Sequence, residues 1–353
     1  AAWIAGGSAA VLALAVSGVL LLTRDDHAPA KPTPSSSPQR LTLSQVSQRA
    51  QPSVVGVEAE GADGVSGGTG FFIRGGHILT GSHIVAQVKP ASKVKIRLSD
   101  KRRLDATIVG RDAARNVAVL KPTGLSDPPP ALPIGDSAKI AAGNWIAYIG
   151  APFGLAGTVR QGSIGKLNTP VTLIGDTPNG TILRAIQLSA QIEPGDAGGP
   201  VLDAYGRVIG MMGVPLLPAS SSDAYQPSPT GIGFALPINQ SMASATHIID
   251  NNGQAPKHAT LGVVPDVTFE GPGVQILRQS TGTGGPRPVV AGSAAERAGL
   301  RPGDTITQIN DERMEDAMDL IAYMLDLPAG SKVRITFQRN GVEKTVEATL
   351  GAK

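Results

Sequence analysis

The chain has 353 residues, enough for two domains of ordinary size, and its 44 glycines, 28 prolines and 17% charged residues favour a turn-rich β protein over a helical bundle. The net charge of +3 and the lack of any long run of basic residues argue against nucleic acid as a partner. Cysteine is absent, which excludes disulfides, thiol nucleophiles and cysteine-ligated zinc.

The first segment, residues 1–22, carries no charge and as a helix would span about 33 Å, roughly the hydrocarbon core of a bilayer. Trp3 lies where an interfacial aromatic residue belongs, and charged residues follow at once from Arg24. We therefore predict a single-pass transmembrane anchor over residues 1–23, with the globular domains on the extracytoplasmic side. The alternative is a cleaved signal peptide, although the apolar core of such a peptide is usually shorter, at about 7–15 residues.

A Pro/Ser-rich stretch follows, and we predict a semi-extended linker over residues 24–40 because such a composition cannot bury a core. From Leu41 onward, short β-type runs alternate with Gly, Asn, Asp and Pro turns, which is typical of a sandwich or a barrel. The predicted strands are 53–59, 70–73, 77–80, 93–98, 106–109, 117–121, 145–149, 182–188, 201–202 and 208–212.

After these strands, residues 215–230 carry four prolines and four serines and are predicted to form a surface loop. A helix over 239–250 is expected to end at the Asn-Asn-Gly run that follows it. We place a domain boundary near Gly253, which gives a first domain over 41–253 and a second over 257–353. The second domain is expected to hold an amphipathic helix around positions 314–325 and two final strands, 332–339 and 342–350.

Four segments of the first domain, taken in chain order, carry the residues that would perform chemistry. They are 68–85 with His83, 110–120 with Asn116, 193–201 with Ala197, and 231–237. In this order, and followed by a PDZ-like segment, they resemble the trypsin-like domain of HtrA proteases of the bacterial cell envelope. The resemblance implies a trypsin-like double β-barrel followed by a PDZ domain, with His83 as the catalytic histidine. Asn116 and Ala197 then stand where the family has aspartate and serine.

The two substitutions remove different parts of the triad. A methyl group at Ala197 cannot attack a carbonyl, so the covalent step is lost. The amide of Asn116 can donate a hydrogen bond where a carboxylate only accepts. We therefore expect it to favour the wrong tautomer of His83 and not to stabilise an imidazolium, at a cost of about 10⁴ in kcat. As written, the protein is not expected to act as a serine endopeptidase, and only the double replacement Ala197→Ser with Asn116→Asp is expected to restore cleavage.

The loop around Ala197 keeps a part of the machinery that needs no side chain. The resemblance assigns the backbone N–H groups of Gly195, Asp196 and Ala197 to the oxyanion hole. The alternative is that Gly195, Gly198 and Gly199 only shape a tight turn. Both interpretations stay open from the sequence.

The second domain contains residues 289–306, which resemble the central segment of PDZ domains. The resemblance makes Leu261, Gly262 and Val263 the loop that binds a peptide carboxylate through successive backbone N–H groups. The C-termini of other proteins are then the expected partners of this domain.

The bound peptide would lie as an added strand between a strand expected over residues 263–269 and the helix that contains Met318 and Ile321. The alternative for the apolar face of this helix is core packing, which we expect for Met314 and Leu325. From this helix, only Met318 and Ile321 are therefore assigned to the groove.

These observations predict a membrane-anchored pseudoprotease that binds polypeptides without cleaving them. Two alternatives stay open: an HtrA-type serine endopeptidase in an engineered inactive form, and a structural scaffold of an envelope complex. The substitution at Asn116 favours the first hypothesis, because an engineered alanine at position 197 would already abolish cleavage.

The resemblance and the composition also bear on cofactors and assembly. The remaining histidines show no ligand spacing, so neither a metal nor another cofactor is expected. HtrA proteins commonly form trimers through aromatic residues near the start of the barrel. Residues 41–60 contain no aromatic residue, so a trimer of that kind is not expected, while other oligomers stay open.

Overall fold

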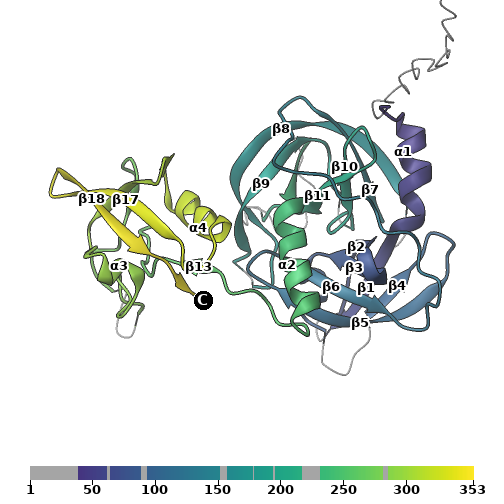
Figure 1. The fold of residues 1–353 in the computed structure, drawn as a ribbon, viewed down its shortest axis with the longest axis horizontal. Helices are drawn as coiled ribbons and strands as arrows, with labels where there is room; N and C mark the ends of the chain where they lie inside the picture. Colours follow the sequence, from purple (N-terminus) through teal and green to yellow (C-terminus); the bar gives the residue numbers. More distant parts are fainter. Residues whose placement is uncertain are drawn as a thin grey trace, which may run out of the picture. The chain divides into compact units, whose positions relative to one another are not determined.

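The computed structural model describes residues 39–353, apart from 62–63, 89–93, 152–156, 178, 194, 217–230 and 281–284. The predicted anchor, nearly all of the predicted linker and most of the predicted surface loop lie outside the described residues. Within the described part of the protein, no helix is both long and apolar enough to cross a bilayer. The described part is mainly β, with two closed six-stranded barrels followed by a smaller β unit (Figure 1).

The first barrel is built from β1 (Val54–Gly61), β2 (Gly64–Ile73), β3 (His77–Thr80), β4 (Val94–Arg97), β5 (Arg103–Asp112) and β6 (Val117–Pro122). It closes in the order β1-β2-β3-β6-β5-β4. Val57 on β1 and Phe72 on β2 point into one core, where each is at most 1% exposed. Every strand predicted in this half overlaps an observed strand.

The second barrel is built from β7 (Trp145–Gly150), β8 (Thr158–Leu173), β9 (Thr181–Ser189), β10 (Pro200–Leu202), β11 (Val208–Gly213) and β12 (Ile232–Pro237). It closes in the order β10-β11-β12-β9-β8-β7. The sequence does not predict β8, which is 16 residues long. Its pairing with β9 shifts register between Ile164 and Lys166 and again before Thr169, so its side chains do not alternate regularly.

A helix precedes the first barrel in a segment where the sequence analysis predicts neither a helix nor a strand. α1 (Leu43–Ala50) begins with a capping box in which Thr42 and Gln45 bond each other's backbone N–H groups. The helix buries Val46 and Ala50 against the barrel core. Its polar composition hides this short apolar face from a sequence reading.

A second helix, α2 (Ile238–Asp250), matches the predicted one and contacts β5 and β6 of the first barrel and β11 and β12 of the second (Figure 1). Two glycines allow the backbone that follows α2 to pass close to β5. A Cβ on Gly110 would overlap the carbonyl oxygen of Gly253, and a Cβ on Gly253 would overlap that of Val109. Gly253 also has a φ of +86°, so this position requires glycine twice over.

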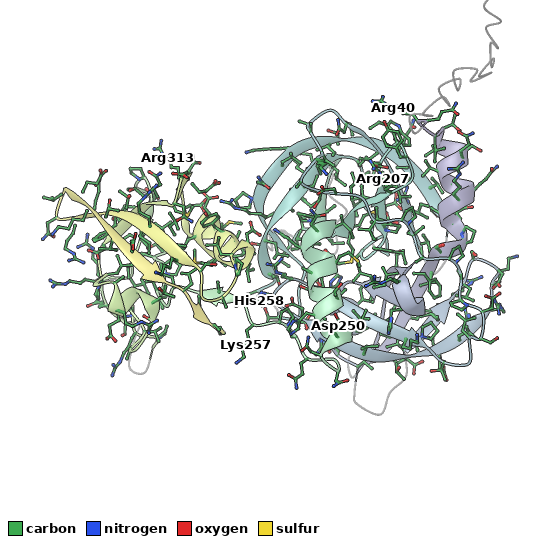
Figure 2. The ribbon with its side chains drawn as sticks, in the orientation of Figure 1. Arg40, Arg207, Asp250, Lys257, His258 and Arg313 are labelled. Atoms are coloured by element: carbon green, nitrogen blue, oxygen red, sulfur yellow. The ribbon has the colours of Figure 1, made fainter. Side chains whose placement is uncertain are left out.

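The backbone leaves α2 at Asp250 and passes Lys257 and His258 before the smaller unit (Figure 2). Buried residues such as Ile306, Ile335 and Phe337 form its core. Its elements are β13 (Ala259–Thr260), β14 (Val274–Gln275), α3 (Ala294–Arg297), β15 (Thr305–Ile309), β16 (Glu312–Arg313), α4 (Ala317–Asp326), β17 (Lys332–Arg339), β18 (Val342–Thr349) and β19 (Gly351–Ala352).

The strand predicted over 263–269 is not formed. The structure has only isolated bridges here, from Val263 to Val289 and from Pro265 to Ile276. Pro265 has no backbone N–H to donate, so a continuous ladder cannot run through it. The edge available to a peptide is therefore shorter than the sequence suggests.

Candidate functional site

His83 lies on a short 3-10 helix, η3 (Ser82–Val85), directly after β3. Ile84 and Val85 of this turn are 1% exposed and anchor it in the core of the first barrel. The imidazole rests on the backbone of Gly81, where an added Cβ would lie 2.9 Å from the ring carbon Cε1. The turn and this glycine together fix the position of the ring.

Asn116 lies in the turn before β6 and contacts His83 directly. Its φ is +54°, a conformation that asparagine tolerates better than most residues, and it is 1% exposed. Its Oδ1 accepts from the backbone N–H of His83 at 3.1 Å and lies 2.9 Å from Nδ1 of the ring. Its Nδ2 donates to the carbonyl oxygen of Ile174 at 2.9 Å.

A carboxylate that the sequence analysis did not single out lies close to this pair. Asp176 accepts from the hydroxyl of Ser82 at 2.9 Å and forms an ion pair with Arg111 at 2.8 Å. Burial lowers the pKa of His83 below its usual range, while the hydrogen bond to Asn116 and the charge of Asp176 oppose that shift in part. The ring is therefore mostly neutral at physiological pH.

The loop that contains Ala197 is tied to β2 by its backbone. Thr69 donates its N–H to the carbonyl of Ala197 at 2.8 Å and its hydroxyl to the carbonyl of Gly195 at 2.6 Å. Gly198 donates to the carbonyl of Met212 at 2.8 Å. The methyl group of Ala197 is 3% exposed and belongs to the same apolar cluster as Ile84, so the loop lies beside the turn that carries the histidine.

Two of the three predicted oxyanion donors stay available in this loop. The N–H of Asp196 is used within the loop, because it donates to the carbonyl of Glu193 at 3.0 Å. The N–H groups of Gly195 and Ala197 donate to no protein acceptor among the residues that the structure describes. An oxyanion site of the trypsin type needs two such groups.

The side chain of Asp196 turns inward. It is fully buried, and Arg160 contacts its Oδ2 at 2.5 Å while the N–H of Glu193 donates to the same oxygen at 2.9 Å. Burial raises the pKa of this carboxyl, and the hydrogen bond from Glu193 and the charge of Arg160 oppose the shift. A buried carboxylate held in this way cannot polarise a water molecule in the cleft.

A cleft of about 670 Å³ opens beside His83. One wall is the β1–β2 hairpin, and the other walls include Ala151, Ile174 and Gly195. The structure thus brings His83 and one oxyanion donor to the same cavity, with Asn116 directly behind the ring.

A second hollow of about 500 Å³ lies between the 260–265 loop and α4. Of the residues predicted for peptide binding, Leu261, Gly262, Val263 and Ile321 line it, whereas Met318 does not. Leu320, Met324 and Leu325 complete the apolar wall, although Leu325 was assigned to core packing. Met314 is 1% exposed and belongs to the core, as the sequence predicts.

The 261–263 loop presents backbone donors to this groove. Its carbonyl groups are engaged, since Leu261 accepts from Ala295 and Gly262 accepts from Val290, both at 2.9 Å. In the described ranges, no protein oxygen accepts from the N–H groups of Leu261, Gly262 or Val263. Successive free N–H groups beside an apolar groove are the donors that a peptide carboxylate requires.

Comparison with protein families agrees with this geometry. A trypsin-like peptidase domain model matches residues 68–211, and a PDZ domain model matches residues 287–339. The first range contains His83, Ala197 and part of the cleft lining, and the second follows the 261–263 loop.

Several proteins with a described activity are similar to this chain. The serine protease PepD of Mycobacterium tuberculosis is 33% identical over 320 residues, which cover 88% of this chain and 66% of that protein. A probable periplasmic serine endoprotease DegP-like protein of Pseudomonas putida is 30% identical over 293 residues, which cover 81% of this chain and 56% of that protein. This chain therefore spans 56% to 66% of the length of these two relatives. The solved HtrA-type protease AlgW with a tripeptide matches with a TM-score of 0.65 and 27% identity, over 89% of this chain and 98% of that one.

Proposed function

The chain belongs to the HtrA-type family of trypsin-like serine proteases, and from this premise we propose that it binds polypeptides without cleaving them. The observation that carries the proposal is Ala197, which stands at the position that the resemblance assigns to the nucleophile. A methyl group cannot form the covalent intermediate, whatever the state of His83. We assign His83, Asn116 and Ala197 to the three triad positions, two of them substituted.

The cleft keeps the features that bind an extended peptide. Its volume of about 670 Å³ falls within the range of about 300–1,000 Å³ that is typical of ligand sites. The N–H groups of Gly195 and Ala197 would donate to a peptide carbonyl. Without a hydroxyl at position 197, such a complex ends at binding.

The groove beside α4 would bind the C-terminus of a partner. The N–H groups of Leu261, Gly262 and Val263 would hold the carboxylate, and the apolar wall with Ile321 and Met324 would hold the last side chain. The AlgW neighbour was solved with a tripeptide, which supports short-peptide recognition in this family.

We further propose that residues 1–23 anchor the protein in a membrane and that the barrels lie on the extracytoplasmic side. The uncharged run of 22 residues supports an anchor, and the description of the DegP-like relative as periplasmic supports the side. Protease added to intact spheroplasts should digest the barrels. Complete protection would exclude this topology.

Peptide binding by the full-length protein tests the proposed function. A peptide with a free carboxylate and an apolar last residue should bind with a micromolar Kd, which corresponds to about −8 kcal/mol. The same peptide with an amidated C-terminus should not bind, because the donors of Leu261, Gly262 and Val263 would lose their anion. Casein should remain intact under the same conditions. Equal binding of both peptides would exclude the groove, and cleavage of casein would exclude the pseudoprotease.

A further inference from the structure

The side-chain amide of Asn116 is held by two backbone groups whose roles cannot be exchanged. The N–H of His83 can only donate, so the amide atom 3.1 Å from it must be the acceptor Oδ1. The carbonyl oxygen of Ile174 can only accept, so the amide atom 2.9 Å from it must be the donor Nδ2. If the amide were rotated by 180°, Nδ2 would face the N–H of His83 and Oδ1 would face the carbonyl oxygen of Ile174. Neither hydrogen bond could then form. The neighbours therefore determine the orientation.

This orientation decides which nitrogen of His83 carries the proton. The atom 2.9 Å from Nδ1 is Oδ1, which has no hydrogen to donate, so Nδ1 must be the donor. We infer that Asn116 and the carbonyl of Ile174 hold His83 in the Nδ1–H tautomer, with the lone pair of Nε2 free. Among the described residues, no protein group bonds Nε2. This is the tautomer that a general base requires.

These contacts argue against the expectation that the amide of Asn116 favours the wrong tautomer. That expectation assumed that Nδ2 would face the ring of His83, but the carbonyl of Ile174 engages Nδ2 instead. A carboxylate at position 116 would place an oxygen against that carbonyl oxygen and lose a hydrogen bond. Asparagine therefore suits this pocket better than aspartate would.

The charged groups near the ring agree with a neutral imidazole. Asp176 is the acidic neighbour, and its carboxylate is already paired with Arg111 and bonded by Ser82. Burial outweighs these contacts and lowers the pKa of His83. The inference stands on the contacts of Asn116 and does not depend on peptide binding, so it remains testable if the proposed function fails.

The tautomer is measured by long-range proton–nitrogen correlation spectra of the full-length protein labelled with ¹⁵N-histidine. The spectrum should contain one ring with a protonated Nδ1 and an unprotonated Nε2 that disappears in His83→Gln, which assigns it among the five histidines. A protonated Nε2 on this ring would overturn the inference. The spectrum reports directly which ring nitrogen carries the proton. A residue that only stabilised the fold would not determine that position.

Reactivity with a fluorophosphonate provides a second measurement. In Ala197→Ser, the new Oγ should bond to phosphorus as fluoride leaves, while Nε2 of His83 takes the hydroxyl proton. Labelling should be lost in Ala197→Ser with His83→Gln, and circular dichroism should show that both variants are folded. If His83 already holds the correct tautomer, a carboxylate at position 116 has little to correct. Adding Asn116→Asp should therefore raise the labelling rate less than about 100-fold, whereas correcting a wrong tautomer should raise it about 10⁴-fold. A gain above about 100-fold would overturn the inference.

Discussion

The barrel cleft and the α4 groove use the backbone in different ways. Backbone hydrogen bonds to Thr69 and Met212 hold the loop around Ala197 on both sides, and the side chain of Asp196 in this loop is buried. The groove is formed by apolar side chains of α4 and by a loop whose N–H groups point to no protein acceptor among the described residues.

The difference explains why one substitution can silence one site and leave the other intact. Covalent catalysis in the cleft requires a single oxygen atom at position 197, and Ala197 lacks it. Carboxylate binding in the groove requires only backbone donors and an apolar wall, which many sequences supply. The following substitutions test how far the rigidity of the cleft exceeds that of the groove.

The largest effect is expected at Gly198. Its φ is +83°, and a Cβ would overlap the carbonyl oxygen of Thr69 and lie 2.7 Å from the hydroxyl of Thr80. The carbonyl group of Thr69 belongs to the backbone and cannot move away as a flexible side chain can. Gly198→Ala should therefore cost about 5 kcal/mol of unfolding free energy. Gly143 has the same φ with no atom within 4 Å, so Gly143→Ala is the matched control and should cost only about 1–2 kcal/mol in urea unfolding. Equal losses would show that the loop can shift.

Arg160 should rank next. Arg160→Met leaves the buried Asp196 carboxylate without its cation, which should cost about 3 kcal/mol at pH 7. Arg207 forms a similar pair with Asp203 at 2.7 Å but is 49% exposed, so Arg207→Met should cost less than about 1 kcal/mol. Because burial already raises the pKa of Asp196, the Arg160→Met variant should regain stability as the pH falls and the acid is protonated. Thermal unfolding from pH 7 to pH 4 measures this, and a loss that does not shrink would contradict it.

A smaller effect is expected in the groove. Gly262 has a φ of +80°, and a Cβ would overlap the side chain of Ser293. Ser293 caps α3 by accepting from the N–H of Glu296, so the 261–263 loop must shift to relieve the overlap. Gly262→Ala should therefore cost about 2 kcal/mol of stability and weaken peptide binding about 30-fold. Gly341 has a φ of +78° and open space, so Gly341→Ala should leave peptide affinity unchanged. If both variants bind peptide alike, the 261–263 loop is not the carboxylate site.

The smallest effect should come from the titration of His83. Its pKa lies below the usual 6.5 in the folded protein because of burial, so the unfolded state takes up the proton first as the pH falls. Its contribution to stability is therefore complete above pH 6.5 and is lost on acidification through the lower folded pKa. His83→Gln should reduce the slope of unfolding free energy against pH in this window. An unchanged slope would place the ring in solvent.

Much of the fold follows from local pattern, and the exceptions have physical causes. The sequence predicted β3 and β17 to the residue. Glycines at 76 and 81 bound β3, and β17 alternates because it buries one face. β8 was missed because its register shifts break the alternation. α1 was missed because only Val46 and Ala50 of its eight residues are buried.

The site was predictable in its parts but not in its contacts. The motifs placed His83, Asn116 and Ala197 in one neighbourhood, because each is fixed by the strand or loop that carries it. The orientation of the Asn116 amide depends on the carbonyl of Ile174, which is 58 residues away in sequence. Nothing local in the sequence indicates that this backbone carbonyl is a partner, so the sequence could not predict which atom of the amide faces the ring.

The paired glycines after α2 bear on where the protein can be divided. Gly253 packs closely against Val109 and Gly110 of β5, so the segment after α2 is held against the first barrel and is not a free joint. A recombinant fragment of the barrels should therefore extend past Gly253 to keep this contact. A fragment of the smaller unit can start at Lys257, because the contact between Gly253 and β5 lies outside it. A reporter domain is better inserted after residue 254 than before it.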